Sequence, residues 1–392
     1  MPTPFRARLV CLATTLILLA ATVAIAQHDS SGGMMGGSTS ERSSKPATKP
    51  TTKPASTTTP RRPTTTRRPT TPSTTSADAY YKQGEALYNQ QKYREALEPY
   101  LKATEINPSM ATALYRLGWI YNDLEDYESA VDPLRRVITL QPNNAAAHFE
   151  LGYAYRKLER YSEALPMFLQ TVRIKPNYEG AHYQMGWIYN EQKNYTAAVQ
   201  SLTTALSYRS DYAEAQTELG YAYKNLGRNA EAIQAYQEAI RLKPEKGDAY
   251  LGLGDVYWYN TKQFPEAANA YKQGLQYSPN NATAHYNLGW CYNDAERYPE
   301  AVQELREAIK LRPTYAEAYN EMGYALHQQN RFAEAVQQYQ IAIRQKANYA
   351  SAHFNLGMSF LALNNRNAAL EQYRILQRID QARATKLFNH MK

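Results

Sequence analysis

Cysteine is nearly absent from this sequence, and the motifs of common enzyme and metal chemistry are missing. The two cysteines are Cys11, inside an apolar N-terminal stretch, and Cys291, so loss of that stretch would leave one thiol and no internal disulfide. The sequence has no glycine-rich phosphate loop, no nucleophile elbow and no His/Cys spacing typical of a metal site. We therefore predict a non-catalytic protein that uses no cofactor and no metal.

A basic surface is also missing from most of the chain, although the net charge is +8. Ten of the 44 Lys and Arg residues, but only two of the 36 Asp and Glu residues, lie within residues 1–76. Residues 77–392 therefore hold 34 basic and 34 acidic residues. This balance argues against nucleic-acid binding by that part of the chain.

The first 26 residues have the pattern of an export signal. Arg6 and Arg8 precede an apolar run over 9–25, and the sequence AIAQ offers a cleavage site after Ala26. We predict a signal peptide at 1–26 and a periplasmic or extracellular protein. The alternative is an uncleaved segment that tethers the protein to a membrane.

Residues 27–76 are rich in Thr, Pro and paired Arg and poor in apolar side chains. Such a composition cannot bury enough surface to offset its ordering entropy, so it predicts a disordered linker. Its simplest role is that of a spacer. Its basic charge leaves open a second role, adhesion to an anionic polymer or lipid surface.

A strict repeat begins at residue 77. A glycine recurs every 34 residues, with one interval of 35, and an alanine follows each glycine twelve residues later, or thirteen in the sixth unit. The glycines are Gly84, Gly118, Gly152, Gly186, Gly220, Gly254, Gly289, Gly323 and Gly357. The alanines are Ala96, Ala130, Ala164, Ala198, Ala232, Ala267, Ala301, Ala335 and Ala369. Six of the first eight units end in proline, at Pro108, Pro142, Pro176, Pro244, Pro279 and Pro313.

This pattern resembles the tetratricopeptide repeat, a 34-residue helix–turn–helix unit. The resemblance implies an all-α, right-handed superhelical solenoid of nine repeats over 77–378, and we expect residues 379–392 to form a capping helix. Small residues at the Gly and Ala positions let the two helices of a unit approach closely. Each hairpin leaves an apolar face uncovered, so stacked neighbours share one continuous core.

We number each repeat from seven residues before its glycine, so that the repeats start at residues 77, 111, 145, 179, 213, 247, 282, 316 and 350. On the first helix, the fourth, seventh, eighth and eleventh residues share one face and predict the packing side. The second, fifth, ninth, twelfth and thirteenth residues point the other way. The resemblance implies that this second face is the concave surface where ligands bind.

That second face is rich in aromatic residues and holds every tryptophan of the protein. Repeats 2, 4 and 7 also place an Asn three residues after the Trp, as in RLGWIYNDLEDY at 116–127. We predict ring-plus-amide subsites for a ligand, with basic residues at the equivalent places of repeats 3 and 5. The predicted residues are Tyr115, Trp119, Asn122, Phe149, Tyr153, Arg156, Tyr183, Trp187, Asn190, Tyr221, Lys224, Trp258, Tyr286, Trp290, Asn293 and Tyr324. The alternative is that the rings only stack between repeats and the charges only form salt bridges.

Two functions fit these features. The leading hypothesis is an exported scaffold that binds a partner protein or an extended peptide, since Tyr and Trp provide large contact areas at small entropy cost. The alternative is the binding of a polysaccharide or cell-wall glycan in export or envelope assembly, because aromatic faces stack on sugars. The family's clamp for a terminal carboxylate is not implied, because Tyr81 and Glu85 occupy its opening positions.

Three further expectations concern the packing. His148, His182, His285 and His353 occupy the fourth position, which predicts packed histidines rather than metal ligands. Cys291 aligns with Ile and Ala of other repeats, which predicts a buried thiol. The extra residue near Asn260–Thr261 predicts a local change of geometry in repeat 6.

Overall fold

The computed structural model describes residues 76–392, and the predicted signal peptide and the predicted linker up to residue 75 lie outside the described residues. In the described part the chain forms nineteen α-helices and one π-helical segment, with no β-strand. This confirms the predicted all-α solenoid class. None of these helices is long and apolar enough to cross a membrane.

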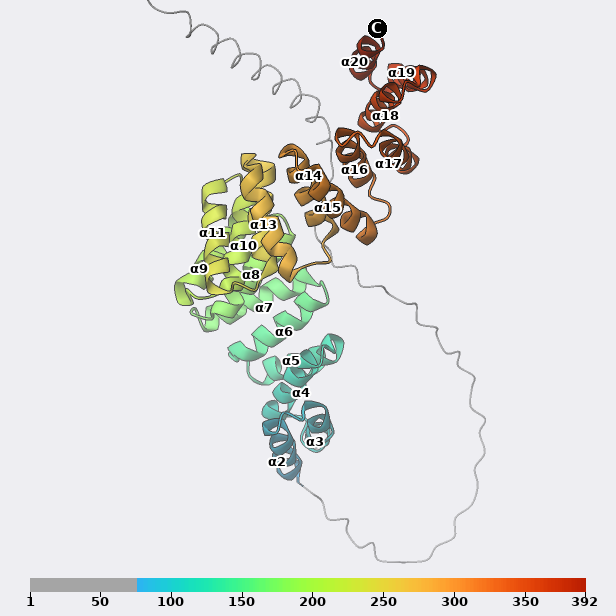
Figure 1. The fold of residues 1–392 in the computed structure, drawn as a ribbon. Coiled ribbons are helices and arrows are strands. Elements are labelled where there is room, and N and C mark those ends of the chain that lie inside the picture. Colours follow the sequence, from blue (N-terminus) through green and yellow to red (C-terminus); the bar gives the residue numbers. More distant parts are fainter. Residues whose placement is uncertain (1–75) are drawn as a thin grey trace, which may run out of the picture. The chain divides into compact units, whose positions relative to one another are not determined.

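Eighteen of the described helices pair into nine hairpins, each made of a helix A and a following helix B (Figure 1). The helices A are α2 (Ala77–Asn89), α4 (Ala111–Asp123), α6 (Ala145–Lys157), α8 (Glu179–Glu191), α10 (Ala213–Asn225), α12 (Gly247–Asp255), α14 (Ala282–Asp294), α16 (Ala316–Gln328) and α18 (Ala350–Ala362). The helices B are α3 (Tyr93–Ile106), α5 (Tyr127–Leu140), α7 (Tyr161–Ile174), α9 (Tyr195–Tyr208), α11 (Asn229–Leu242), α13 (Phe264–Tyr277), α15 (Tyr298–Leu311), α17 (Phe332–Gln345) and α19 (Arg366–Ile379). A last helix, α20 (Gln381–Met391), contacts α18 and α19.

Small residues hold each hairpin together. Gly186 of α8 faces Leu202 of α9 so closely that a Cβ at Gly186 would lie 2.5 Å from Leu202 Cγ. The alanine that follows each glycine in the sequence pattern is fully buried in helix B, as Ala198 is in α9. The period of small residues therefore sets the distance between the two helices, as predicted.

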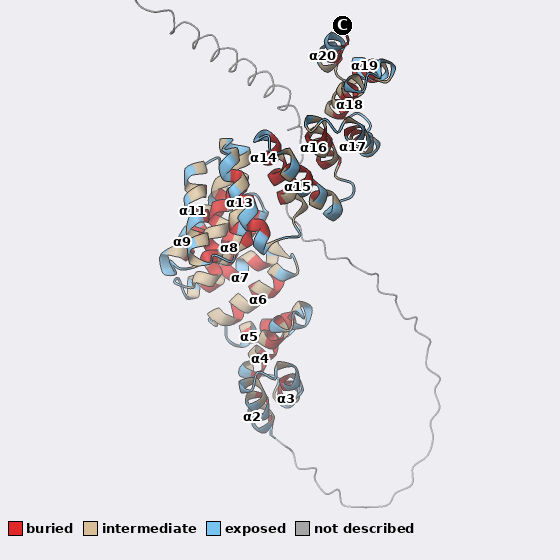
Figure 2. Ribbon diagram, viewed as in Figure 1, coloured by how far each residue is buried: buried red, intermediate tan, exposed pale blue. Residues whose placement is uncertain are grey.

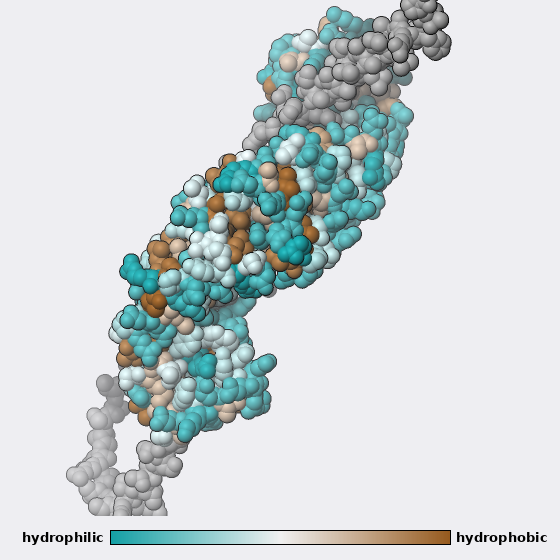
Figure 3. Space-filling view, turned by 90° about the vertical axis from the view of Figure 1, so that its left-hand side faces the viewer, coloured by the Kyte–Doolittle hydropathy of each residue, from teal (hydrophilic) through white to brown (hydrophobic). Residues whose placement is uncertain are grey.

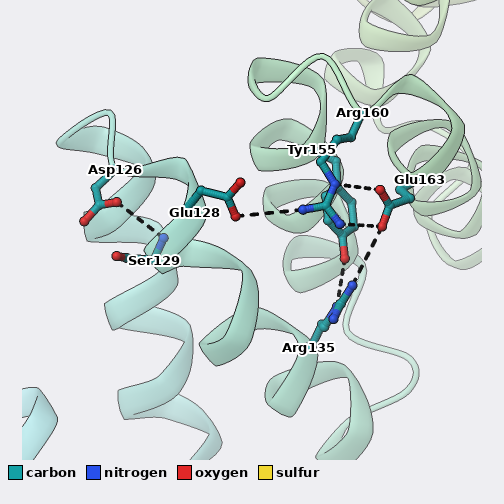
Figure 4. A network of polar contacts seen from close by, with 7 residues as sticks. All are labelled: Asp126, Glu128, Ser129, Arg135, Tyr155, Arg160 and Glu163. Atoms are coloured by element: carbon teal, nitrogen blue, oxygen red, sulfur yellow. Dashed lines mark hydrogen bonds and ion pairs between the residues drawn. The ribbon is translucent and has the colours of Figure 1, made fainter. Parts of the chain in front are cut away.

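Neighbouring hairpins form the continuous core. Helix B of one repeat packs on helix A of the next, as α5 does on α6 and α9 on α10, and successive helices A also touch. Buried residues lie on the sides of the helices that face these neighbours (Figure 2). Outside this core, exposed ion pairs link repeats 2 and 3: Arg160 pairs with Glu163 of its own repeat at 2.6 Å and with Glu128 of the preceding repeat at 3.8 Å (Figure 4). Such exposed pairs contribute little to stability.

The turn between the two helices of a repeat contains one residue with left-handed backbone geometry. Its φ lies between +57° and +61° wherever it is not glycine, and it is +72° at Gly227. The nonglycine examples are Gln91, Glu125, Glu159, Lys193, Lys262, Glu296, Asn330 and Asn364. Only glycine adopts this region without steric cost, so eight of these nine turns carry some strain.

The extra residue of repeat 6 is accommodated within helix A. After Asp255 the helix changes from α12 to a π-helical segment, Val256–Thr261. A π-turn holds one residue more than an α-turn, so the insertion changes the helix type rather than forming a loop. Asn260 on this segment donates to Asn229 Oδ1 of repeat 5 at 2.9 Å. The predicted irregularity of repeat 6 is therefore a π-helical segment at the end of its helix A.

The predicted packing of the histidines and the cysteine is confirmed. His148 and His353 are buried, His182 and His285 are half-buried, and Nε2 of each lies close to a backbone carbonyl at the end of the preceding repeat. The four acceptors are Pro142 O at 2.9 Å, Pro176 O at 2.8 Å, Pro279 O at 3.0 Å and Ala347 O at 2.9 Å. Cys291 is 2% exposed, and burial raises the pKa of its thiol.

Candidate binding surface

We call the surface formed by the second, fifth, ninth, twelfth and thirteenth residues of the helices A the ring stripe. Twelve of the sixteen residues predicted for it are half-buried, with part of each side chain exposed. They are Tyr115, Trp119, Phe149, Tyr153, Arg156, Tyr183, Trp187, Tyr221, Lys224, Trp258, Trp290 and Tyr324. The other four are buried, so the prediction that they line an open groove is wrong for Asn122, Asn190, Tyr286 and Asn293. Figure 3 shows one side of the molecule, where apolar patches are separated by hydrophilic surface.

The rings at the ninth position pack against the preceding repeat. Six of them meet the aromatic residue that begins the preceding helix B, with ring planes 63° to 75° apart. The pairs are Tyr93–Trp119 at 5.3 Å, Tyr127–Tyr153 at 6.2 Å, Tyr161–Trp187 at 6.0 Å, Tyr195–Tyr221 at 6.1 Å, Phe264–Trp290 at 4.7 Å and Tyr298–Tyr324 at 6.3 Å between ring centroids. These edge-to-face contacts stabilise the joints between repeats. Inter-repeat stacking is therefore part of their role.

Three rings at the fifth position pack against a ring of their own repeat. Phe149, Tyr183 and Tyr286 each contact the tyrosine that ends the repeat, with centroids 4.8 to 4.9 Å apart. The three partners are Tyr178, Tyr212 and Tyr315. A Lys or Arg lies over each partner ring at 4.5 to 5.2 Å. Each set forms a compact cluster of two rings and a cation.

The three asparagines do not form open subsites beside the tryptophans. Asn122 Nδ2 donates to the backbone oxygen of Glu150 at 3.0 Å and to Glu150 Oε2 at 2.9 Å. Asn190 makes the same two bonds to Glu218, and Asn293 makes them to Glu321. The amide thus ties one repeat to the next. The prediction that these amides are free to bind a ligand is wrong, because the twelfth residue faces the following hairpin.

The three glutamates were not predicted, although the sequence contains a signal for them. Each lies at the sixth position of its repeat, 28 residues after the asparagine that bonds it. Burial raises the pKa of Glu150 and of Glu218, and the asparagine bonds only partly oppose it. Burial likewise raises the pKa of Glu321 to about 7, against the bonds donated by Asn293 and Asn320. None of the three forms a salt bridge within the described part.

The charged residues of the ring stripe differ in their pairing. Lys224 forms a salt bridge with Asp255 at 3.0 Å. Arg156 instead lies over the rings of Trp187 at 4.6 Å and Tyr153 at 5.3 Å, and its Nε is buried without a hydrogen-bond partner. Arg156 is therefore held by ring contacts, whereas Lys224 is neutralised.

Trp258 lies on the π-helical segment and packs on the following repeat. Its ring is 5.3 Å from that of Trp290 and 4.1 Å from that of Tyr259, close to perpendicular in both cases. This cluster maintains ring contact across the insertion, where Asp255 replaces the ninth-position ring. Tyr259 is left 50% exposed.

The described residues contain no group of three or more His, Cys, Asp or Glu able to hold a metal ion. One hollow of about 330 Å³ lies between α11, α12 and α13, lined by residues of the packing side such as Tyr250, Leu253 and Tyr257. It is not part of the ring stripe.

The repeated hairpins and the shared core define an α-solenoid. Sequence profiles described as tetratricopeptide repeats match residues 81–145, 123–179, 251–316 and 304–337. A profile described as TPR repeat matches residues 186–227, 222–261 and 323–364. Together these matches extend over most of the described part, and the chain belongs to the tetratricopeptide repeat family.

Several solved structures are similar to parts of this chain. The C-terminal part of a TPR repeat-containing protein from Cytophaga hutchinsonii is 17% identical over 62% of this chain and 99% of its own, with a TM-score of 0.50. YrrB, described as a TPR protein with an unusual peptide-binding site, is 24% identical over 49% of this chain and 100% of its own, with a TM-score of 0.46. The Cut9–Hcn1 hetero-tetramer of APC/C matches at 17% identity over 72% of this chain and 55% of its own, with a TM-score of 0.47. The comparison with curated proteins found no match.

Proposed function

We propose that this protein is an exported, non-catalytic scaffold that binds an extended segment of a partner protein along the ring stripe. The observation that supports the proposal is the row of partly exposed rings at the ninth position in six repeats. Solenoid repeat proteins use such extended surfaces for binding. Export rests on the sequence of residues 1–26 alone.

The ring contacts suit a long, irregular ligand better than a small molecule. Each ring is fixed at one edge by the preceding repeat, so little side-chain entropy remains to be lost on binding. The exposed portions recur at the same position in six repeats. A partner in extended conformation could contact several repeats in succession, and the many weak contacts would add up.

The test is an affinity capture from native envelope extract with the full chain as bait. Tyr153 and Tyr221 are suitable residues to change, because their ring contacts, at 6.2 and 6.1 Å, are longer than those of the ninth-position tryptophans and should contribute less to folding. We expect the Tyr153→Ser/Tyr221→Ser variant to lose the partner. The matched control is Tyr208→Ser, since Tyr208 is 50% exposed at the end of helix B, outside the ring stripe. Equal capture by all three baits would contradict the proposal.

The polysaccharide alternative has lost one of its supports. It depended on amides beside the rings that could bond sugar hydroxyls, and those of Asn122, Asn190 and Asn293 are bonded to glutamates. The same captures should nevertheless be assayed for carbohydrate. Carbohydrate that is retained by the wild-type chain and lost with the double variant would favour the glycan function over the protein-binding one.

A further inference from the structure

The three buried asparagine–glutamate pairs have more acceptors than donors. The Asn amide group donates to Glu, while the Oδ1 atoms of Asn122, Asn190 and Asn293 are buried and have no hydrogen-bond partner among residues 76–392. These asparagine side chains are 2 to 6% exposed. The glutamates themselves are half-buried and keep part of their surface accessible. Each pair thus combines a desolvated carboxyl group with an unused acceptor, and no Lys or Arg of the described residues forms an ion pair with it.

The residue that ends the repeat distinguishes one pair from the other two. Beside Glu150 this residue is Tyr178, and beside Glu321 it is Tyr349, and each tyrosine interacts electrostatically with its glutamate. Tyr115 and Tyr286 of the preceding repeats interact electrostatically with the same two glutamates. Each of these glutamates therefore has two neighbouring tyrosines, one from its own repeat and one from the preceding repeat.

Beside Glu218 the corresponding residue is Lys246. Its charge favours the ionised form of Glu218, and so does that of Arg156, although neither forms a salt bridge with it. In repeat 5 the chain thus has, near Glu218, a lysine that pairs with Glu214 at 3.5 Å, where repeats 3 and 8 have a tyrosine. This internal example indicates which group would complete the other two sites.

We propose that the partner segment is basic, and that its Lys or Arg side chains bind to the carboxylates of Glu150 and Glu321. This inference rests on the proposed function and names the chemistry of the partner. An ammonium or guanidinium group would donate to the carboxylate, and such a charge-assisted bond is strong where water is largely excluded. The charge balance of residues 77–392 means that general attraction would not draw a basic peptide to this part. Specific sites are therefore required.

The test is a titration of labelled synthetic peptides with the full chain, in which binding is measured by fluorescence anisotropy. One peptide alternates Lys with Ser and is long enough to extend along the repeats, and its neutral counterpart has Gln in place of Lys. We expect Glu150→Gln and Glu321→Gln each to weaken binding of the Lys peptide about 10-fold, the usual effect of losing one charge-assisted bond. Glu218→Gln is the matched control, because it removes the same charge from the same register and should change affinity less than about 2-fold.

A second variant keeps the carboxylate. Tyr178→Lys places a lysine beside Glu150 as Lys246 stands beside Glu218, so it should weaken the Lys peptide as much as Glu150→Gln does. Thermal denaturation and circular dichroism of every variant would establish that the repeats remain folded. Gln keeps an acceptor oxygen for the asparagine amide, so no large loss of structure is expected.

The possible failures are distinguishable. Equal weakening by all three Glu→Gln changes would mean a general charge effect and would overturn the inference. Binding that Tyr153→Ser weakens but no Glu→Gln change affects would also overturn it, while the proposed function stands. If an acidic peptide binds instead, and Arg156→Gln abolishes that binding, the partner segment is acidic and the inference is overturned. Binding of the Lys peptide that is insensitive to Tyr153→Ser and to all Glu→Gln changes would count against both proposals.

Discussion

Replacement of Glu321 by Gln should make the stability of the protein less dependent on pH. The carboxyl group of Glu321 accepts hydrogen bonds from Asn293 at 3.3 Å and from Asn320 at 3.1 Å. Burial raises its pKa from the ordinary 4.5 to about 7, so the folded state holds this proton more tightly than the unfolded state. The neutral group is therefore compatible with the fold and the ionised group is costly.

The direction and size of the effect follow from this difference. Below pH 4.5 the group is protonated in both states and costs nothing, and above about pH 7 it is ionised in both. Between these values the folded state loses stability as pH rises, by about 1.4 kcal/mol per unit of pKa difference, or about 3 kcal/mol in total. Glu321→Gln, which cannot ionise, should avoid this loss.

The assay is thermal or denaturant unfolding of both proteins at about pH 4 and about pH 8, read as the difference between them. Taking the difference removes the titration of other groups, such as Glu150, and any constant effect of the new amide on Asn320. From about pH 4 to about pH 8, the free energy of unfolding of Glu321→Gln should rise by about 3 kcal/mol relative to that of the wild type. Unfolding of a repeat array need not be two-state, so hydrogen exchange of α16 gives an independent local measurement. A difference that stays constant from about pH 4 to about pH 8 would refute the reasoning.

Three further predictions concern packing and turns. Gly186→Ala should destabilise the chain by about 1–2 kcal/mol, because overpacking against Leu202 outweighs the better helix propensity of alanine; unchanged thermal stability would contradict this. Gly227→Ala should lower the free energy of unfolding by about 1 kcal/mol, because alanine must adopt a left-handed φ; no clash adds to this cost, since no other atom lies within 4 Å of the new Cβ. Lys193→Gly should raise the free energy of unfolding by a similar amount. Denaturant unfolding should therefore show changes of opposite sign for the two variants, and changes of the same sign would contradict the reasoning. Leu387→Ala should cost about 3 kcal/mol, because Leu387 is fully buried between α20 and α18, and hydrogen exchange should increase first in these helices; faster exchange in α4 alone would be inconsistent.

The repeat period alone predicted most of the fold, because the hairpin depends on local interactions. Gly186 and Ala198 are small where two helices of one unit approach, and this requirement can be read from a 34-residue interval without knowledge of other repeats. The helix wheel likewise separated His148 on the packing side from Trp119 on the ring stripe. The extra residue of repeat 6 could be located from the interval between glycines, although its form as a π-turn could not.

The tertiary structure decided what the ring stripe offers to a ligand. The sequence places Trp119 and Asn122 one turn apart on a helix, but it does not contain the rotation between successive hairpins. That rotation turns Asn122 toward Glu150 of the next repeat, while Trp119 meets Tyr93 of the preceding one. The glutamates became visible only at this joint, where burial raises their pKa values against the opposing effect of the asparagine bonds. Local periodicity therefore determined the elements and their faces, and the contacts between repeats determined which side chains remain available for binding.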